Sequence, residues 1–237
     1  MPEVATSLLI KDLRGGYGGK PVLQGIDLDV REGEITAVIG RNGVGKSTLM
    51  KSIIGLVPAS HGSIWFRGQD IGALSPHSRA RLGLGYVPQG RDVFPRMSVE
   101  ENLQVGLSIA GTGAGDFDEV YGYFPILKER RRQTAGTLSG GQQQQLAIGR
   151  VLIGKPHVLL LDEPSEGIQP SIVQDIGRLV VELNRTAGLT VILVEQNIDL
   201  IRAMAQRCFV MDKGRVVTEL TPAMLEDRDV VRRHLAV

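Results

Sequence analysis

Three short motifs in this chain carry groups that bind phosphate or activate water. Residues 40–47, Gly-Arg-Asn-Gly-Val-Gly-Lys-Ser, have the glycine, lysine and serine spacing of a phosphate-binding loop. Residues 158–163, Val-Leu-Leu-Leu-Asp-Glu, form an apolar run that ends in two carboxylates. Leu-Ser-Gly-Gly-Gln lies between them at 138–142, and simple nucleotide-binding enzymes lack this third motif. The three motifs together predict more than nucleotide binding alone.

The phosphate-binding loop has the flanking elements that such a loop needs. Residues 33–39 are apolar and β-branched, which predicts a buried strand, and residues 47–54 suit a helix. A glycine-rich turn of this kind also arises by chance. That alternative is disfavoured because every fixed position of the motif falls between a strand and a helix.

The chemistry of the loop follows from its residue types. Gly40, Gly43 and Gly45 let backbone N–H groups turn toward phosphate oxygens at the positive end of the following helix. Lys46 adds a charge for the outer phosphates. The Ser47 hydroxyl is an oxygen ligand of the kind that Mg²⁺ prefers.

The carboxylate pair Asp162 and Glu163 follows a run of apolar residues, which predicts that both lie at the end of a buried strand. We expect this strand to lie beside the phosphate-loop strand in a parallel sheet, with the ligand at that edge. Asp162 would anchor Mg²⁺, and Glu163 would polarise the water that attacks the γ-phosphate. The alternative is an ordinary turn after a strand. Pro164 disfavours it, because a proline directly after the pair ends the strand and keeps both carboxylates at the edge.

With Tyr17, Gln89 and the turn 164–167, these motifs resemble the ATP-binding subunits of ABC transporters over nearly the whole chain. The resemblance implies an α/β P-loop NTPase fold, with a RecA-like parallel-sheet core, an antiparallel β layer and an inserted helical subdomain. In that family the motif at 138–142 opens a helix whose N-terminus faces the γ-phosphate on the second subunit's loop. Two ATP molecules are thereby enclosed at a dimer interface.

The family's functional positions carry over to this chain residue by residue. A tyrosine at Tyr17 would stack on adenine, and Gln89 would sense the metal and join the core to the helical subdomain. Without the family context, both are unremarkable turn residues, and a Ser-Gly-Gly helix cap is also common. The implied ligands are ATP and Mg²⁺. The implied nucleotide-binding residues are Tyr17, Gly40, Asn42, Gly43, Gly45, Lys46, Ser47, Thr48, Gln89, Ser139, Gly140, Gly141, Gln142 and Asp162; the metal would be held by Ser47, Gln89 and Asp162, and the catalytic residues would be Glu163 and Gln196.

Gln196 is a departure from the family pattern. Most relatives place a switch histidine after the apolar run 190–194, whereas this chain has Glu195-Gln196-Asn197. Glutamine forms hydrogen bonds but cannot take a proton. We therefore expect this subunit's own ATP site to be slower or to depend on its partner.

Composition supports a single ATPase domain. The chain has 237 residues, of which 42% are apolar, and 30 glycines, as expected of an α/β protein rich in loops. The net charge of +1 gives no support to nucleic-acid binding, and the basic run 128–132 is expected to be a solvated helix end. Cys208 is the only cysteine, so no internal disulfide forms, and it is expected in the core. The four histidines lack metal-ligand spacing.

The sequence predicts one domain, 1–237, in two parts. Residues 1–89 and 151–237 would form the nucleotide-binding core, and residues 90–150 the helical subdomain. Short strands up to about residue 38, with the segment 62–68, are expected to form the antiparallel layer. Helices are expected to begin at Val99, Phe117 and Gln142, with a loop at 111–115 and a short final helix at 230–235.

The family implies where the protein works and with what. No apolar stretch approaches the ~18 residues of a membrane span, and the N-terminus lacks a signal pattern. The resemblance implies a peripheral protein at the cytoplasmic face of the inner membrane. Its partners would be a second ATPase subunit, two permease subunits and, indirectly, a solute-binding protein. A heterodimer is expected, with a homodimer as the alternative.

The transported solute rests on resemblance alone. Residues 90–103 look like the ATPases of branched-chain amino acid and urea importers, and residues 142–145 with 166–171 favour the urea type. We therefore expect uptake of urea or a related small amide or amino acid, with a branched-chain amino acid importer as the alternative. A non-transport ATPase of the superfamily is disfavoured by the single cassette and the absence of heptads. A module that binds ATP without hydrolysis is disfavoured by Glu163 and favoured by Gln196.

Overall fold

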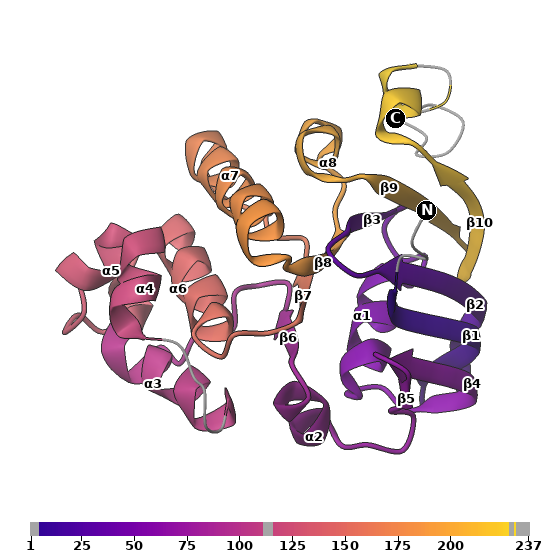
Figure 1. Cartoon of the computed structure of the whole chain (residues 1–237), viewed down its shortest axis with the longest axis horizontal. Helices are drawn as coiled ribbons and strands as arrows, with labels where there is room; N and C mark the ends of the chain where they lie inside the picture. Colours follow the sequence, from indigo (N-terminus) through magenta and orange to yellow (C-terminus); the bar gives the residue numbers. More distant parts are fainter. Residues whose placement is uncertain (1–4, 111–115, 228–229, 231–237) are drawn as a thin grey trace.

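Two β-sheets and a separate group of helices form the described part of the chain, residues 5–110, 116–227 and 230, in this computed structural model (Figure 1). The larger sheet has six strands, and five of them are parallel. β10 is antiparallel to its neighbour β9 at one edge. In spatial order the strands are β10 (Arg215–Leu220), β9 (Arg207–Asp212), β3 (Ile35–Ile39), β8 (Thr190–Val194), β7 (Val158–Asp162) and β6 (Leu84–Val87).

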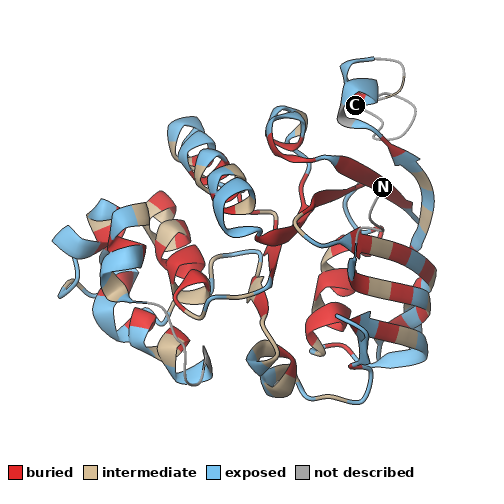
Figure 2. Ribbon diagram, in the orientation of Figure 1, coloured by how far each residue is buried: buried red, intermediate tan, exposed pale blue. Residues whose placement is uncertain are grey.

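The central strands are apolar on both sides because each side faces a hydrophobic core. Every residue of β3, β7 and β8 is buried, as the red central strands of Figure 2 show. Side chains alternate along a strand, so Leu159 and Leu161 enter one core while Val158 and Leu160 enter the other. The predicted buried strand before the phosphate loop is therefore confirmed as β3.

One prediction about this sheet is wrong. The carboxylate strand β7 does not lie beside the phosphate-loop strand β3, because β8 lies between them and pairs with both. β8 is as apolar as β3 and β7, so the local sequence does not show which of the three strands lies between the other two. The loop that follows β8 therefore lies between the loops that follow β3 and β7.

The antiparallel layer contains β1 (Thr6–Tyr17), β2 (Lys20–Arg31), β4 (Ala59–Phe66) and β5 (Gln69–Asp70), in the order β2-β1-β4-β5. β1 and β2 each have 12 residues, so the expected short strands are in fact one long hairpin. Helix α1 (Lys46–Ile54) contributes Leu49, Met50 and Ile53 to the core that it shares with both sheets. This packing fixes the helix that follows the phosphate loop.

The helical group contains α3 (Val99–Ala110), α4 (Phe117–Tyr123), α5 (Pro125–Glu129), a 3-10 turn (Ala135–Thr137) and α6 (Gly140–Leu152). Helix starts at Val99 and Phe117 are confirmed, whereas α6 begins at Gly140, two residues before the predicted start. The predicted loop at 111–115 lies outside the described residues. The basic run 128–132 is exposed at the end of α5, as predicted.

The remaining helices are α2 (Pro76–Arg81), α7 (Pro170–Ala187), α8 (Ile198–Met204) and a 3-10 helix (Pro222–Glu226). The final helix predicted at 230–235 falls almost entirely outside the described residues. Cys208 is fully buried in β9, and burial raises the pKa of its thiol to about 12. Its predicted place in the core is therefore confirmed.

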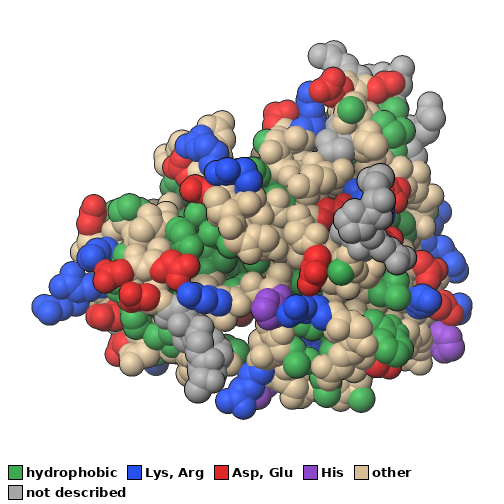
Figure 3. Space-filling view, viewed as in Figure 1, with side chains coloured by type: hydrophobic (Ala, Val, Ile, Leu, Met, Phe, Trp, Pro, Cys, Tyr) green, Lys and Arg blue, Asp and Glu red, His purple; other side chains and the backbone are tan. Residues whose placement is uncertain are grey.

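Charged side chains of both signs are mixed over the face shown in Figure 3, in agreement with the net charge of +1. Within the described residues, none of the helices combines the length and the apolar character needed to cross a membrane.

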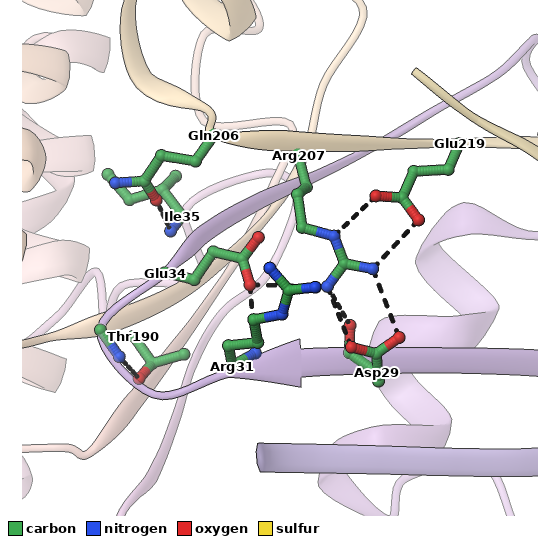
Figure 4. A network of polar contacts seen from close by, with 9 residues as sticks. Asp29, Arg31, Glu34, Ile35, Thr190, Gln206, Arg207 and Glu219 are labelled. Carbon is green, nitrogen blue, oxygen red and sulfur yellow. Dashed lines mark hydrogen bonds and ion pairs between the residues drawn. The ribbon is translucent and has the colours of Figure 1, made fainter. Parts of the chain in front are cut away.

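A polar cluster joins the antiparallel layer to the edge of the large sheet (Figure 4). Arg207 on β9 donates hydrogen bonds to both carboxylate oxygens of Glu219 on β10, at 2.7 and 3.0 Å. It also donates to both oxygens of Asp29 on β2, at 3.0 and 3.3 Å. Its guanidinium is 3.5 Å from Glu34 and lies over the ring of Phe209. We call Arg207, Asp29, Glu34 and Glu219 the Arg207 cluster.

Candidate nucleotide site

Four loops meet at one edge of the large sheet because the strands that precede them are parallel. They follow β3, β8, β7 and β6, which are neighbours in that order. The loops therefore line up as the phosphate loop, Glu195–Asn197, Glu163 and Gln89. This edge is where ligands bind in open parallel sheets.

Two side-chain amides hold Glu163 from opposite sides. The Gln196 amide nitrogen donates to Glu163 Oε1 at 2.9 Å and to Asn42 Oδ1 at 2.7 Å. The Gln89 amide nitrogen donates to Glu163 Oε2 at 3.1 Å and to Glu166 Oε2 at 3.0 Å. Both oxygens of Glu163 thus accept a hydrogen bond, and the carboxylate is fixed in position. We call Asn42, Gln196, Glu163, Gln89 and Glu166 the amide chain.

The phosphate loop needs glycine at two positions for different reasons. A Cβ on Gly40 would lie 2.3 Å from the Met211 carbonyl oxygen, so no side chain fits there. Gly45 has φ 110° at the N-cap of α1, a backbone conformation that other residues rarely adopt. The predicted loop and helix are therefore confirmed, with N–H groups at the positive end of α1.

Lys46 is a buried cation without a full set of anionic partners. Its side chain is 4% exposed, and Nζ donates to the carbonyl oxygens of Gly40 at 2.8 Å and Arg41 at 3.1 Å. The nearest carboxylate oxygen among its ion pairs, Glu163 Oε1, is 3.7 Å away. Burial lowers the pKa of Lys46, and Glu163 only partly opposes this effect. An incoming anion would therefore be stabilised here.

Oxygen ligands for a hard cation lie beside the loop. Ser47 Oγ donates to Asp162 Oδ1 at 3.0 Å, and the Tyr86 hydroxyl donates to Asp162 Oδ2 at 3.3 Å. Burial raises the pKa of Asp162, although these two hydrogen bonds oppose the shift. In the described part of the chain, no group of three or more His, Cys, Asp or Glu could hold a metal alone. A hydroxyl with one carboxylate suits Mg²⁺, which takes its other ligands from phosphate and water.

A cavity of about 440 Å³ opens between these groups. Most predicted residues of the chain's own site line it, but Tyr17, Gly40, Asp162 and Gln196 do not. Tyr17 is 50% exposed at the end of β1. Val22 of β2 lines the cavity instead. The cavity is lined by Val22, Asn42, Gly43, Gly45, Lys46, Ser47, Thr48, Gln89 and Glu163.

The motif at 138–142 lies outside this cavity. Ser139 is exposed and caps α6, since its hydroxyl accepts from the Gln142 N–H at 3.4 Å while the Gln142 side chain accepts from the Ser139 N–H at 3.0 Å. A Cβ on Gly141 would lie 2.3 Å from Ile172 of α7. Glycine is therefore needed there for packing, a reason that the sequence did not suggest.

Two residues were missed by sequence reasoning. Tyr86 supports Asp162, and its place three residues before Gln89 at the end of β6 was the available signal. Glu195 is 2% exposed and accepts from the backbone N–H groups of Ser165, Gln196 and Asn197. It therefore ties the loop after β7 to the loop after β8. A carboxylate directly after an apolar strand was the signal, as it was for Asp162.

Comparisons with known proteins agree with this geometry. Residues 23–166 match the family model described as ABC transporter. The chain is 44% identical to the high-affinity branched-chain amino acid transport ATP-binding protein BraG of Pseudomonas aeruginosa, over 91% of this chain and 93% of that protein. It is 38% identical to the probable branched-chain amino acid transport ATP-binding protein LivF of Archaeoglobus fulgidus, over 86% and 87%.

Among solved structures, a nucleotide-free ATP-binding cassette from an ABC transporter superposes with a TM-score of 0.80 and 28% identity, covering 95% of this chain and 97% of the other. The predicted α/β cassette fold is therefore confirmed. Family model, relatives and fold agree with a phosphate loop and a carboxylate held at one sheet edge: the chain belongs to the ABC transporter family and is an ATPase subunit.

Proposed function

We propose that this chain binds and hydrolyses ATP to power an importer for an amino acid or related small amide, as one of a pair of ATPase subunits on a membrane permease. The observation that carries the proposal is the amide chain, which fixes the Glu163 carboxylate beside the cavity that contains Lys46. Its place of action would be the cytoplasmic face of the inner membrane.

ATP would bind through its phosphates at the N-terminus of α1. The Lys46 ammonium would exchange its bonds to the loop carbonyls for the β- and γ-phosphates, which relieves an under-neutralised buried charge. Mg²⁺ would be held by Ser47, Gln89 and Asp162, and Asp162 already accepts a hydrogen bond from Ser47. The metal would neutralise charge that develops on the phosphates.

Glu163 would orient and deprotonate the attacking water. Its two oxygens are already held by Gln196 and Gln89, so the carboxylate needs little reorganisation when the water arrives. Glu163 therefore acts on the water and not on ATP binding.

The motif at 138–142 would serve ATP on the second subunit's loop. Supporting this, Ser139 and the N-terminus of α6 are absent from the chain's own cavity, yet Ser139 is exposed at a helix N-terminus that favours anions. In a dimer, Ser139→Arg should block nucleotide on the partner's loop and leave nucleotide on this chain's own loop. Photolabelling of each subunit checks this, and loss confined to this chain's loop would contradict the arrangement.

A permease helix would dock in an apolar groove between the core and the helical group. The groove has a volume of about 410 Å³, and its exposed apolar side chains include Leu56, Phe94 and Ile109. An amphipathic helix laid in such a groove buries its apolar face. Phe94→Glu should abolish co-purification with the permease while ATP binding persists. Val217→Glu, at an exposed apolar residue outside the groove, is the matched control.

The solute is proposed from relatives and not from the site. The names of BraG and LivF favour branched-chain amino acids. Urea is the second candidate, because residues 142–145 and 166–171 look like those of urea-type subunits. The test uses a strain that lacks this subunit and measures uptake of labelled leucine and of labelled urea separately, before and after the chain is expressed in it. The compound whose uptake is restored is the solute.

A non-transport ATPase of the same superfamily is the main rival. Purification of the chain in detergent from its native membrane distinguishes a transporter subunit from a non-transport ATPase. Permease subunits in stoichiometric amounts support the proposal, and their absence under conditions that retain the second ATPase subunit would contradict it. The same preparation distinguishes the expected heterodimer from a pair of identical chains.

A further inference from the structure

Arg91 lies two residues after Gln89, and its guanidinium contacts two other segments. Nη2 donates to the carbonyl oxygens of Glu166 at 3.3 Å and Gly167 at 3.1 Å. A Cβ on Gly140, the first residue of α6, would lie 2.9 Å from Arg91 Nη1. The side chain thus rests between the turn 164–168 and the N-terminus of α6. We call these two segments the facing pair.

The backbone around Arg91 is unusual and firmly held. Arg91 and Asp92 have φ 74° and 50°, in the left-handed region that residues other than glycine sparsely populate. Such conformations persist where the surrounding structure determines them, and they concentrate at functional sites. Here the Asp92 carbonyl accepts a hydrogen bond from Arg150 Nη2 at 2.7 Å.

Arg150 connects this segment to the apolar groove. Its guanidinium carbon lies 4.9 Å from the centre of the Phe94 ring, and both residues line the groove. Contacts therefore run without a break from the groove through Arg150 and residues 91–92 to the facing pair. Arg150 itself lies in the last turn of α6, so movement of a helix docked in the groove would reach the turn 164–168 and the N-terminus of α6 along this route.

The charge of Arg91 is also informative. A cation beside the first residue of a helix opposes the helix dipole, which favours anions at that end. The two carbonyl oxygens offset part of this repulsion. The arrangement becomes favourable when an anion approaches the N-terminus of α6, and in a dimer that anion is the γ-phosphate on the partner's loop.

We propose that Arg91 is a positioning residue that holds the facing pair together and thereby supports ATP hydrolysis on the partner subunit's phosphate loop. The inference rests on the shared-site dimer of the proposed function. A residue that acted only through its neighbour Gln89 would affect this chain's own site instead. The two possibilities therefore differ in which of the two ATP sites they affect.

The test measures hydrolysis at one site at a time in the assembled dimer with its permease. Lys46→Ala on this chain leaves only the site on the partner's loop, and the equivalent lysine change on the partner leaves only this chain's own site. Arg91→Ala is added to each background, and single-turnover hydrolysis of bound ATP is followed. Arg91→Gln, which keeps an amide donor, is made in parallel, and the exposed Arg96→Ala is the matched control.

Arg91→Ala should slow hydrolysis on the partner's loop by roughly tenfold to a hundredfold, the effect expected of a misplacement of about 1 Å. Hydrolysis on this chain's loop should change by less than about twofold, and Arg91→Gln should be intermediate. Equal loss at both sites, loss only at this chain's own site, or no loss would overturn the role of Arg91.

Ser139→Arg in the same two backgrounds separates that failure from failure of the dimer arrangement. If Ser139→Arg blocks only the partner's loop while Arg91→Ala shows no such preference, the role of Arg91 alone is wrong. If Ser139→Arg also lacks the preference, the shared site is wrong, and the proposal for Arg91 is wrong with it.

Discussion

Two polar clusters in this molecule use the same types of residue in opposite ways. In the Arg207 cluster, one guanidinium meets both oxygens of Asp29 and both oxygens of Glu219 (Figure 4). At the nucleotide edge, the Lys46 ammonium bonds to backbone carbonyls and lies 3.7 Å from Glu163. One cation is saturated by carboxylates, and the other is not.

The pKa shifts of the two cations express this difference. Hydrogen bonds with Glu219 raise the pKa of Arg207, whereas burial lowers the pKa of Lys46. A saturated cluster stabilises the junction between β2, β9 and β10 and offers nothing to a ligand. An under-neutralised buried cation costs folding free energy that an incoming phosphate recovers. The comparison separates residues that maintain the fold from residues that we propose to bind ATP.

The largest effect is expected for Lys46→Ala. ATP affinity should fall by roughly a hundredfold or more, because charge-assisted bonds to two phosphates contribute about 1.5–3 kcal/mol each. Stability should not fall, because the variant removes a poorly compensated buried charge. Calorimetric titration with ATP and denaturant unfolding check both statements. Lys128→Ala, at an exposed lysine paired with Asp118, is the control, and unchanged ATP affinity in Lys46→Ala would refute the assignment.

Arg207→Met should show the reverse pattern. Removing the guanidinium leaves three carboxylates close together, and we expect a loss of about 2 kcal/mol in the free energy of unfolding. This loss in unfolding free energy lies between those expected for buried and for surface ion pairs, since the Arg207 side chain is 10% exposed while those of Asp29 and Glu219 are 43% and 47% exposed. ATP affinity should be unchanged. A loss of ATP affinity as large as that of Lys46→Ala would break the distinction between the two clusters.

The Arg207 cluster also predicts a dependence of stability on pH. Hydrogen bonds with Arg207 lower the pKa values of Asp29 and Glu219 in the folded state. Their contribution is therefore complete above the unfolded values of about 4 and is lost as pH falls through the folded values. The difference in unfolding free energy between wild type and Arg207→Met should be largest near pH 7 and shrink toward pH 3. A constant difference over that range would contradict this reasoning.

Sequence alone predicted the parts of the nucleotide site that short motifs encode. Gly40 and Asp162 could be placed at strand ends, and Lys46 at the start of the following helix, because an apolar run and a breaker locate those ends. The order of the strands could not, because β3, β7 and β8 are equally apolar and their order depends on packing of the whole chain.

The contacts of Arg91 and Glu195 were also beyond the sequence. A carboxylate after a strand is ordinary unless it is buried, and the sequence does not show that Glu195 is buried and accepts a hydrogen bond from the Ser165 N–H in the loop after β7. The sequence likewise does not show that Arg91 lies against Gly140 and Gly167 in the folded chain. Both are contacts between loops that are distant in the sequence.

The smallest effect is expected for Gln196. The structure gives its amide two acceptors, Glu163 and Asn42, and Glu163 keeps a second amide from Gln89 when Gln196 is removed. Gln196→Ala should therefore reduce turnover at this chain's own site less than ~10-fold, since one neutral hydrogen bond contributes on the order of 1 kcal/mol. Gln196→His should not lower it. Complete loss of ATP-driven uptake in Gln196→Ala, with the complex assembled, would show that glutamine itself performs the switch role.

The most direct measurement separates ATP binding from hydrolysis at Glu163. Glu163→Gln removes the carboxylate that we propose acts on water but leaves Lys46 and the phosphate loop intact. With Mg²⁺ and ATP, the variant should bind nucleotide and persist as a closed dimer in light scattering, while ATPase activity is lost. With ADP it should return to the wild-type assembly state. ATPase activity equal to that of wild type would contradict the account, because Glu163 would then have no part in the reaction.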